Sequence, residues 1–260
     1  MGSNVKNLEA GDWVLGHLHH APSTANGTLA EYIVVSANQC AKYDGEKVSG
    51  AVAAAATTEC MTALQALRDH GHLVPKTGKE EAPPSVLVIG AAGGVGSAAV
   101  QIARTLGAHV TAVCGDRDVK RVQDLGAHVV WSRTQVPDPL SSDQRFDIIF
   151  DTPVVLSPVK AMKSLKKGGN YVTTLPTWGL LWGILASMFS SKGVHMVEVK
   201  PVGQDFATVS QWLASEGEDK LTIFIDSTYK IKDISQAWKR QHERKTGRVV
   251  IQVENGWMDG

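Results

Sequence analysis

Residues 85–105 constrain the fold of this chain more than any other stretch. Four apolar residues at 86–89 are followed by a glycine-rich turn, and small and apolar residues then recur at helical spacing. This order predicts a buried strand, a tight turn and a helix. Ala91, Gly93 and Gly96 fill the three positions of the dinucleotide fingerprint, where Gly93 lets the backbone approach a pyrophosphate and Gly96 lets the helix pack closely on the strand. The free N–H groups at the helix start favour an anion, so the stretch predicts a nucleotide-binding turn, with a purely structural turn as the alternative.

The alternation of strands and helices continues through the middle of the chain. Strands are expected at 109–114, 129–131, 146–150, 171–175 and 195–199, and helices at 118–125, 159–165 and 206–215. Such alternation predicts an α/β fold with a doubly wound parallel sheet, right-handed crossovers and ligands at the carboxyl ends of the strands.

Residues 5–60 are β-rich by comparison. Short strands are expected at 13–16, 29–35 and 40–43, and an alanine-rich helix at 51–67 leads into the nucleotide-binding part. A last section begins at 224–226 and contains a helix at 234–242 and a closing strand at 248–253. We therefore expect the first part of the chain to be β-rich and its helix to lead into the next domain.

Composition narrows the class of partner and the compartment. Lys plus Arg and Asp plus Glu number 26 each in 260 residues, so no net field favours nucleic acid or an anionic membrane, and a small molecule is the expected partner. Cys40, Cys60 and Cys114 are scattered, which argues against a disulfide framework and a structural zinc lobe and fits a cytoplasmic location. The longest apolar stretch, 178–189, is too short to span a bilayer.

Several ordered motifs together resemble one family. They are Gly-Asp-Trp-Val at 11–14, Ala-Glu-Tyr-Ile-Val at 30–34, Thr-Ala-Leu-Gln-Ala-Leu at 62–67, the turn at 90–96, Phe-Asp-Ile-Ile-Phe-Asp-Thr at 146–152, Leu-Lys-Lys-Gly-Gly at 165–169 and Gly-Arg-Val-Val at 247–250. This set resembles the medium-chain dehydrogenase/reductase superfamily, in its zinc-independent quinone oxidoreductase and enoyl reductase branch. The resemblance implies a Rossmann domain at 63–219, a GroES-like catalytic domain at 1–62 and 220–260, and NADPH in the cleft between them.

The chain departs from the family pattern at its beginning. In the family a long section precedes the Gly-Asp-x-Val motif, which here already stands at 11–14, so we expect a truncated GroES-like domain, as a fragment or as a natural short form. Cys60 stands near a position that can bind zinc in relatives, but the early ligands are missing, so no metal is expected and Cys60 is interpreted as a buried thiol. Unpaired edges in such a domain need cover, and a homodimer paired through the strand at 195–199 is expected, as in the family.

The choice between NADPH and NADH depends on the end of the second strand. An acidic residue there favours NAD, but Cys114 and Gly115 occupy this place, with Asp116 and Arg117 just beyond. Asp116 could instead cap the next helix. We expect NADPH rather than NADH. The expected cofactor contacts are Gly93, Gly94, Val95, Gly96, Gly115, Arg117, Asp151, Thr152, Thr174 and Leu175, with Thr62 as a further candidate; Asp151 could equally cap a turn before Pro153.

No signature identifies a catalytic acid or nucleophile. His19, His20 and Glu59 are the polar candidates for a substrate pocket, although surface histidines and a helix carboxylate are the ordinary alternative, and the histidines at 17–20 lack the further ligands that a metal site needs. Glu59 lies in an apolar run, where burial would raise the pKa of its carboxyl. Trp178, Trp182 and Phe189 are expected to form an apolar substrate wall or an oligomer contact rather than core.

Two functions remain open at this point. The first is an NADPH-dependent reductase of a quinone, an enone or an enoyl thioester, acting on a small apolar or conjugated substrate without a metal. The second is a shortened reductase scaffold that performs non-redox chemistry, such as a cyclase or isomerase of a biosynthetic pathway, or that senses a nucleotide. Oxidation of NADPH by a panel of acceptors would distinguish them.

Overall fold

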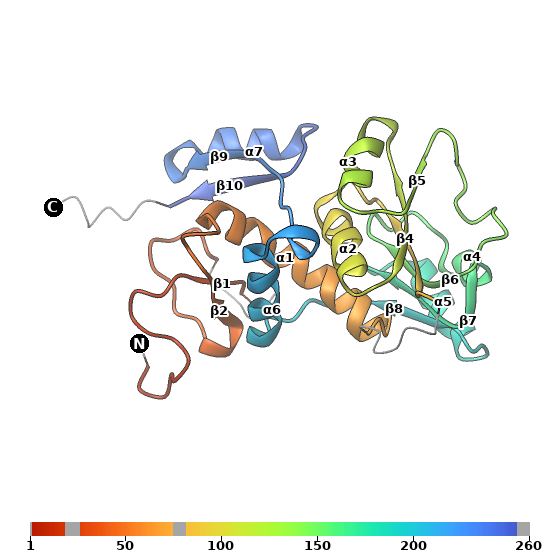
Figure 1. Ribbon diagram of the computed structural model, residues 1–260, viewed down its shortest axis with the longest axis horizontal. Coiled ribbons are helices and arrows are strands. Elements are labelled where there is room, and N and C mark those ends of the chain that lie inside the picture. Colours follow the sequence, from red (N-terminus) through yellow and green to blue (C-terminus); the bar gives the residue numbers. More distant parts are fainter. Residues whose placement is uncertain (1, 19–26, 75–81, 254–260) are drawn as a thin grey trace. The chain divides into compact units, whose positions relative to one another are not determined.

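The computed structural model describes residues 2–18, 27–74 and 82–253, and it divides into two compact units (Figure 1). One unit comprises Met1–Met61 with Lys200–Gly260, and the other comprises Thr62–Val199. The two ends of the chain thus join in one unit. Helix α6 (Gly203–Ala214), which the sequence analysis assigned to the nucleotide-binding domain, packs on strand β2 (Cys40–Lys42) in the first unit.

The second unit is a six-stranded parallel sheet with helices packed against its strands. Its strands are β3 (Ser85–Ile89), β4 (His109–Cys114), β5 (Val129–Ser132), β6 (Phe146–Asp151), β7 (Leu165–Thr173) and β8 (Gly193–Met196). They lie in the order β5-β4-β3-β6-β7-β8, and every neighbouring pair is parallel. This is the strand order of a dinucleotide-binding fold, in which the direction of winding reverses between β3 and β6.

Four helices follow strands β3, β4, β6 and β7, one after each strand. They are α2 (Gly94–Thr105), α3 (Val119–Asp124), α4 (Pro158–Lys163) and α5 (Trp178–Ser187). Helices cover the sheet, and its strands are accordingly rich in apolar residues. Leu87 and Ile89 of β3 pack with Met162 of α4 and Leu180 of α5 in one buried cluster. Helix α1 (Gly50–Gln65) precedes the sheet and continues into a π-helical turn, Ala66–His70.

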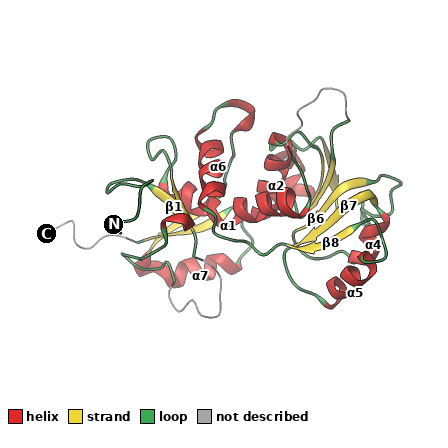
Figure 2. Cartoon of the chain, turned by 90° about the horizontal axis from the view of Figure 1, so that it is seen from below, coloured by secondary structure: helices red, strands yellow, loops and turns green. Residues whose placement is uncertain are grey.

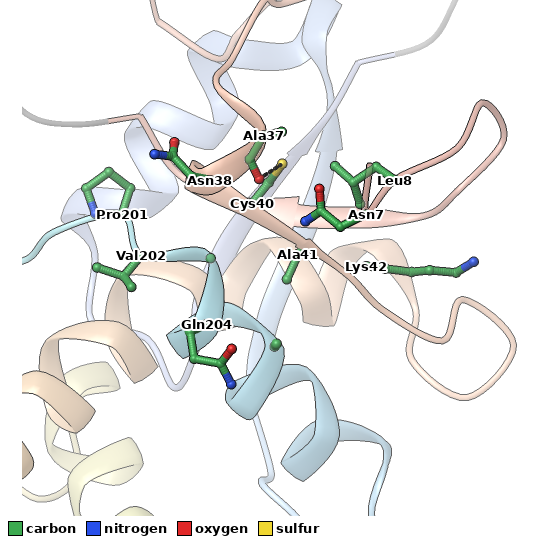
Figure 3. Close-up of a pocket in the computed structure, with 12 residues that line it drawn as sticks. Asn7, Leu8, Ala37, Asn38, Cys40, Ala41, Lys42, Pro201, Val202 and Gln204 are labelled. Carbon is green, nitrogen blue, oxygen red and sulfur yellow. Dashed lines mark hydrogen bonds between the residues drawn. The ribbon is translucent and has the colours of Figure 1, made fainter. Parts of the chain in front are cut away.

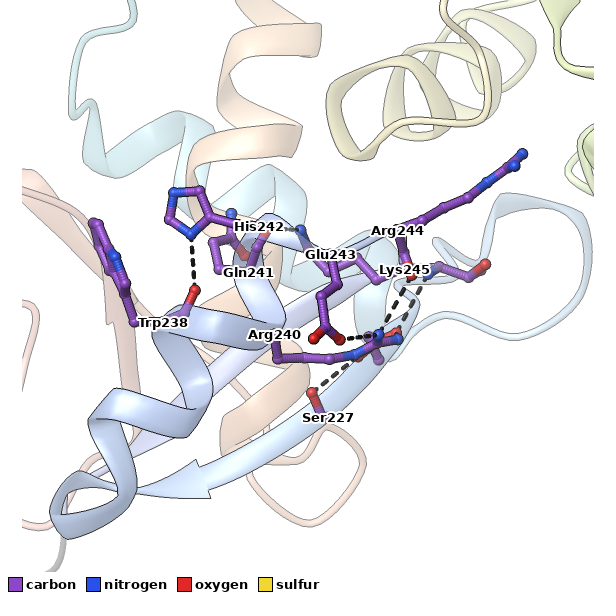
Figure 4. A network of polar contacts seen from close by, with 10 residues as sticks. Ser227, Trp238, Arg240, Gln241, His242, Glu243, Arg244 and Lys245 are labelled. Atoms are coloured by element: carbon purple, nitrogen blue, oxygen red, sulfur yellow. Dashed lines mark hydrogen bonds and ion pairs between the residues drawn. The ribbon is translucent and has the colours of Figure 1, made fainter.

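The first unit contains only short sheets among its described residues. Strand β1 (Val14–Gly16) pairs antiparallel with β2, and β9 (Ile225–Lys230) pairs parallel with β10 (Arg248–Gln252). Helix α7 (Ile234–His242) packs on β9 and β10 and carries Arg240, whose guanidinium binds both carboxylate oxygens of Asp226 at 2.6 and 2.8 Å (Figure 4). Short 3₁₀ turns at Ala37–Gln39, Asp116–Asp118, Gly217–Asp219 and Ile231–Asp233 complete the description.

One predicted strand is wrong. Residues 29–35 form no strand, and their apolar side chains are exposed, from 37% at Val35 to 101% at Val34. β-branched and aromatic residues favour a strand only when a neighbouring strand supplies hydrogen bonds and a packing face. Two strand boundaries also differ from the prediction. Strand β7 begins at Leu165 rather than at 171, and the helix before it already ends at Lys163. Strand β8 lies at Gly193–Met196 rather than at 195–199.

Candidate functional site

The glycine-rich turn after β3 is held by the neighbouring strand. The backbone N–H groups of Gly90 and Ala91 both donate to the Val113 carbonyl of β4, at 3.1 and 3.0 Å, and Gly93 N–H donates to Gly90 O at 2.9 Å. Gly90 has a φ of +76°, which the reversal of the chain requires and which side chains rarely adopt. The turn therefore has a fixed shape, and helix α2 begins directly after it.

Gly96 and Gly93 of the turn differ in how much room their surroundings leave for a side chain. A Cβ on Gly96 would lie well under 3.0 Å from the backbone of Gly90 and Ala91, so only glycine lets α2 approach the strand this closely. A Cβ on Gly93 would meet only Gly90 O, at 3.4 Å. Gly93 thus borders open space beside the first N–H groups of α2, which have no partner within the helix. A helix start of this kind is suited to an anion such as a pyrophosphate.

An acidic side chain from the turn after β4 and a basic side chain from the turn after β5 lie near the end of β4. Asp116 accepts a hydrogen bond from the Thr134 hydroxyl at 2.5 Å, and hydrogen bonds from Thr134 and Ser132 lower the pKa of the Asp116 carboxyl. Arg133 follows β5, its backbone N–H donates to Cys114 O at 3.0 Å, and its guanidinium lies 3.3 Å from where a Gly115 Cβ would stand. A cation therefore lies over Gly115, where an adenosine phosphate would be placed.

Sequence reasoning missed Arg133 although it named Gly115 and Arg117. Arg117 is exposed, while Arg121 binds Asp118 at 2.7 Å and the Ala92 carbonyl of the glycine-rich turn at 3.1 Å. Arg133 comes eighteen positions after Gly115 in the chain, so only the pairing of β4 with β5 brings the two together. The signal was present, because neighbouring parallel strands end at the same edge of a sheet.

Asp151, at the end of β6, is engaged inside the protein. Its carboxylate is fully buried and accepts hydrogen bonds from the Tyr171 hydroxyl at 2.9 Å, Leu156 N–H at 2.7 Å and Val155 N–H at 3.3 Å. Burial raises the pKa of this carboxyl, and these hydrogen bonds oppose the rise. The geometry matches the alternative of a turn cap, because the side chain shapes the loop after β6.

Two threonines continue the same edge. The Thr152 hydroxyl donates to Ile89 O of β3 at 2.9 Å, and the Thr174 hydroxyl donates to Thr152 O at 3.0 Å. Thr152 also lies beside Gly90, within 2.7 Å of where a Cβ on Gly90 would stand. The structure thus brings the turn, Thr152 and Thr174 together at the carboxyl ends of β3, β6 and β7, where the winding of the sheet reverses. Leu175 follows and is 60% exposed.

Comparisons with known proteins place the chain among reductases. Residues 94–215 match the family described as zinc-binding dehydrogenase. The chain is 30% identical to a chloroplast envelope quinone oxidoreductase homolog of Arabidopsis thaliana over 97% of its own length and 76% of the relative's. It is 35% identical to the mitochondrial NAD(P)H oxidoreductase RTN4IP1 of Homo sapiens, over 97% and 67% of the two lengths. The fold is similar to that of the quinone oxidoreductase from Coxiella burnetii, with a TM-score of 0.76, 24% identity, and 98% and 76% of the two chains covered.

The chain belongs to the medium-chain dehydrogenase/reductase superfamily, in its quinone oxidoreductase-like branch. The resemblance found in the sequence motifs is thereby confirmed, as is the α/β fold with a Rossmann-type sheet. The relatives named above are an NAD(P)H oxidoreductase and a quinone oxidoreductase homolog, which fits a cofactor-binding edge on the six-stranded sheet.

The remaining candidates from the sequence are Glu59 and Thr62 of helix α1 and the histidines at 19 and 20. Glu59 of α1 is buried and forms an ion pair with Arg248 at 3.1 Å; burial raises the pKa of its carboxyl, and Arg248 opposes the rise. Cys60 is fully buried, which raises the pKa of its thiol, and Thr62 is buried on the same helix. His19 and His20 lie outside the described residues.

The described ranges also bear on metals and membranes. Among residues 2–18, 27–74 and 82–253, no three His, Cys, Asp or Glu side chains come together as metal ligands. Within the same ranges no helix is both long enough and apolar enough to cross a bilayer.

An open pocket of about 590 Å³ lies inside the first unit (Figure 3). Strand β2 and the start of α6 form much of its lining, with Asn7, Asn38, Lys42 and Gln204 as polar members. The Lys42 ammonium in this lining is paired with Asp12 at 2.5 Å. None of the residues predicted for a site in this superfamily lines the pocket.

Proposed function

We propose that the chain is an NADPH-dependent reductase of a quinone or of another activated double bond, working without zinc. The observation that carries this proposal is the turn at Gly93–Gly96, where a helix start faces open space and a Cβ on Gly96 has no room. NADPH, when bound, supplies a hydride, and a proton from solvent completes the reduction of the acceptor. Membership of the quinone oxidoreductase-like branch supports the reductase class.

Within this proposal the chain's own residues bind and orient. The N–H groups of Gly94, Val95 and Gly96 bind the pyrophosphate at the start of α2. Arg133 and Arg117 bind the 2′-phosphate beside Gly115, and Arg121 fixes the turn through Ala92. Thr152 and Thr174 line the switch point. Asp151 holds the loop after β6 in place by accepting a hydrogen bond from the Leu156 N–H.

The preference for NADPH is tested with the Arg133→Ser variant. Loss of a charged hydrogen-bond donor at the 2′-phosphate should raise the Kd for NADPH at least tenfold, which corresponds to about 1.4 kcal/mol or more, and leave the Kd for NADH nearly unchanged. Arg145→Ser is the matched control, because Arg145 is equally exposed but precedes β6, at the opposite edge of the sheet. Fluorescence titration of both cofactors measures the effect. Equal weakening of NADPH and NADH would contradict the assignment.

The reductase activity is tested by following NADPH absorbance with a panel of quinones, enones and enoyl thioesters. We expect consumption of NADPH with at least one of these acceptors. NADPH binding without consumption by any of them would favour the alternative of a non-redox catalyst or nucleotide sensor. Absence of nucleotide binding would contradict both the reductase and the sensor.

We propose in addition that the protein is a homodimer. Within the described residues β8 pairs with β7 alone, so its outer edge offers backbone groups to a second copy. Light scattering on the purified chain should give the mass of a dimer, and a monomeric mass would contradict the pairing of β8 edges.

A further inference from the structure

Helix α5 exposes most of its apolar side chains. Trp178, Leu181, Trp182, Leu185 and Phe189 recur at three- and four-residue spacing, so they share one face of the helix and of the turn that ends it. Their exposed fractions are 84%, 49%, 65%, 42% and 91% in that order, and Met188 adds 72%. A contiguous apolar face of this kind in a folded protein marks an interaction surface. We call it the α5 face.

The opposite side of α5 is firmly packed. Leu180 is buried in the cluster beneath the helix, and a Cβ on Gly183 would stand 2.6 Å from Pro158 and 3.1 Å from Val194. The helix therefore sits against α4 and β8 with no room to rotate. Figure 2 shows α5 at the outer side of the sheet, next to α4 and β8. The α5 face cannot turn inward and belongs to the surface of this unit.

Charge is unevenly distributed along the part of the sequence that contains α5. Residues 152–197 contain five lysines, at 160, 163, 166, 167 and 192, and no aspartate or glutamate. With 26 acidic residues in 260, an even spread would place four or five of them in these 46 positions. The whole chain is neutral, but this part is basic and apolar at once.

The fold brings Lys192, and the chain next to Lys163 and Lys167, to the turn that ends α5. Lys192 donates to the Met162 carbonyl of α4 at 2.6 Å, and Gly168 N–H donates to Ser191 O at 3.1 Å, so the turn after α5 adjoins both α4 and the start of β7. Lys166 is paired with Asp147. Lys160, Lys163 and Lys167 are exposed, and no described carboxylate lies within ion-pair distance of them.

We propose that the α5 face docks on the surface of an anionic lipid bilayer. Trp and Phe side chains partition into the boundary between headgroups and acyl chains, and lysines beside them attract anionic headgroups. The ten-residue helix would lie along the surface and would not cross the bilayer. The expectation of no membrane partner rested on the net charge of the whole chain, which the local distribution around α5 does not follow.

Flotation of the full chain with lipid vesicles tests the proposal. Vesicles of phosphatidylcholine containing phosphatidylglycerol should bind the protein, and vesicles of phosphatidylcholine alone should bind it at least tenfold more weakly, with the difference shrinking as salt is added. Brominated lipid acyl chains should quench the fluorescence of Trp178 and Trp182 in the bound state.

Two sets of variants separate the apolar and charged contributions. Combining Trp178→Ser, Trp182→Ser and Phe189→Ser should lower vesicle binding at least tenfold, whereas Trp238→Ser, of a 68% exposed tryptophan in the other unit, should leave it unchanged. Combining Lys160→Gln, Lys163→Gln and Lys167→Gln should abolish the preference for anionic vesicles. The same changes at the exposed Lys6, Lys47 and Lys220 should not. All the changed side chains are exposed, so thermal melting should show intact folding.

Three results would overturn the proposal. They are no binding of the wild-type chain to anionic vesicles, equal binding to anionic and neutral vesicles, and binding that the α5-face substitutions leave intact. If vesicles fail to bind and the apolar substitutions convert a larger oligomer into a smaller one, the α5 face joins copies of the chain instead.

Discussion

The two units place similar apolar residues in opposite environments. In the second unit, runs of valine and isoleucine such as those in β3 and β6 are fully buried because strands and helices cover them. In the first unit, Tyr32, Ile33 and Val34 are exposed and make no ladder, although their β-forming character is at least as strong. The difference shows that burial follows from the number of neighbouring elements, and propensity alone does not decide it.

The sharpest way to break the second unit is to fill the space that Gly96 leaves. Gly96→Ala would force a methyl group against the backbone of Gly90 and Ala91, which cannot move aside as a flexible side chain would. We expect the free energy of unfolding to fall by about 3 kcal/mol or more, measured by denaturant titration. Gly93→Ala is the control, because its Cβ meets only Gly90 O at 3.4 Å; folding should persist while NADPH binding weakens. Equal stability of both variants would contradict the close packing.

A smaller effect is expected from the buried pair of Tyr171 and Asp151. Tyr171→Phe removes a 2.9 Å hydrogen bond and leaves a buried carboxylate with one donor fewer, at a cost of about 1–3 kcal/mol in the free energy of unfolding. Tyr32→Phe, at a 71% exposed tyrosine of the first unit, should cost almost nothing. Chemical denaturation of both variants measures the contrast, and similar losses would show that the first unit is better packed than its exposure indicates.

The same pair predicts a dependence on pH. Burial raises the pKa of Asp151 in the folded chain above its value of about 3.9 in the unfolded chain, so folding takes up a proton between these two values. The penalty of the buried charge is fully present above the folded pKa and is relieved as the pH falls through it. Asp151→Asn should remove this contribution, so the difference in unfolding free energy between variant and wild type should change with pH only in that window.

In the first unit, the pair of Arg240 and Asp226 offers a milder test. Arg240 lowers the pKa of Asp226 to about 2, so the pair stabilises the fold above pH about 3.9 and the contribution is lost as the pH falls through about 2. Arg240→Gln should move the acid unfolding midpoint of this unit to higher pH, as followed by circular dichroism. Arg244→Gln, of a neighbouring exposed arginine, should not move it.

The smallest effect should come from Val34→Ser. Val34 is 101% exposed, so the free energy of unfolding should stay within about 0.5 kcal/mol of the wild type. Val88→Ser in β3, which places a polar group at a fully buried position, should be strongly destabilising by the same denaturant measurement. A loss above about 1 kcal/mol for Val34→Ser would mean that something covers this segment in solution.

The sequence was most informative where local pattern and environment agree. The run at 86–89, the glycine spacing and the alternation that follows predict a six-stranded sheet because each element carries its own period and its own breakers. Residues 29–35 show the opposite case, since a strand needs a partner that no local pattern can supply. The position of Arg133 beside Gly115 depends on the pairing of β4 with β5, which a parallel sheet makes foreseeable but which no local pattern fixes.

The candidate site is predicted unevenly for the same reason. Gly93 and Gly96 could be assigned from spacing, because their roles concern backbone space. Whether Asp151 faces a ligand or the protein interior could not be decided, because its hydrogen bond to Tyr171 joins positions twenty residues apart on two strands. The exposure of the α5 face was also open, since an apolar helix can be core, wall or surface by sequence alone.

One residue at this edge has a further consequence. Val154 has a φ of +57°, a left-handed conformation that a β-branched side chain strongly resists, and the carboxylate of Asp151 accepts hydrogen bonds from the residues that follow it. Strain of about 1–3 kcal/mol persists only where the surroundings impose the shape. The loop after β6 is therefore preorganised by the protein itself. A ligand that binds at the switch point, as proposed, would cost this loop little conformational entropy.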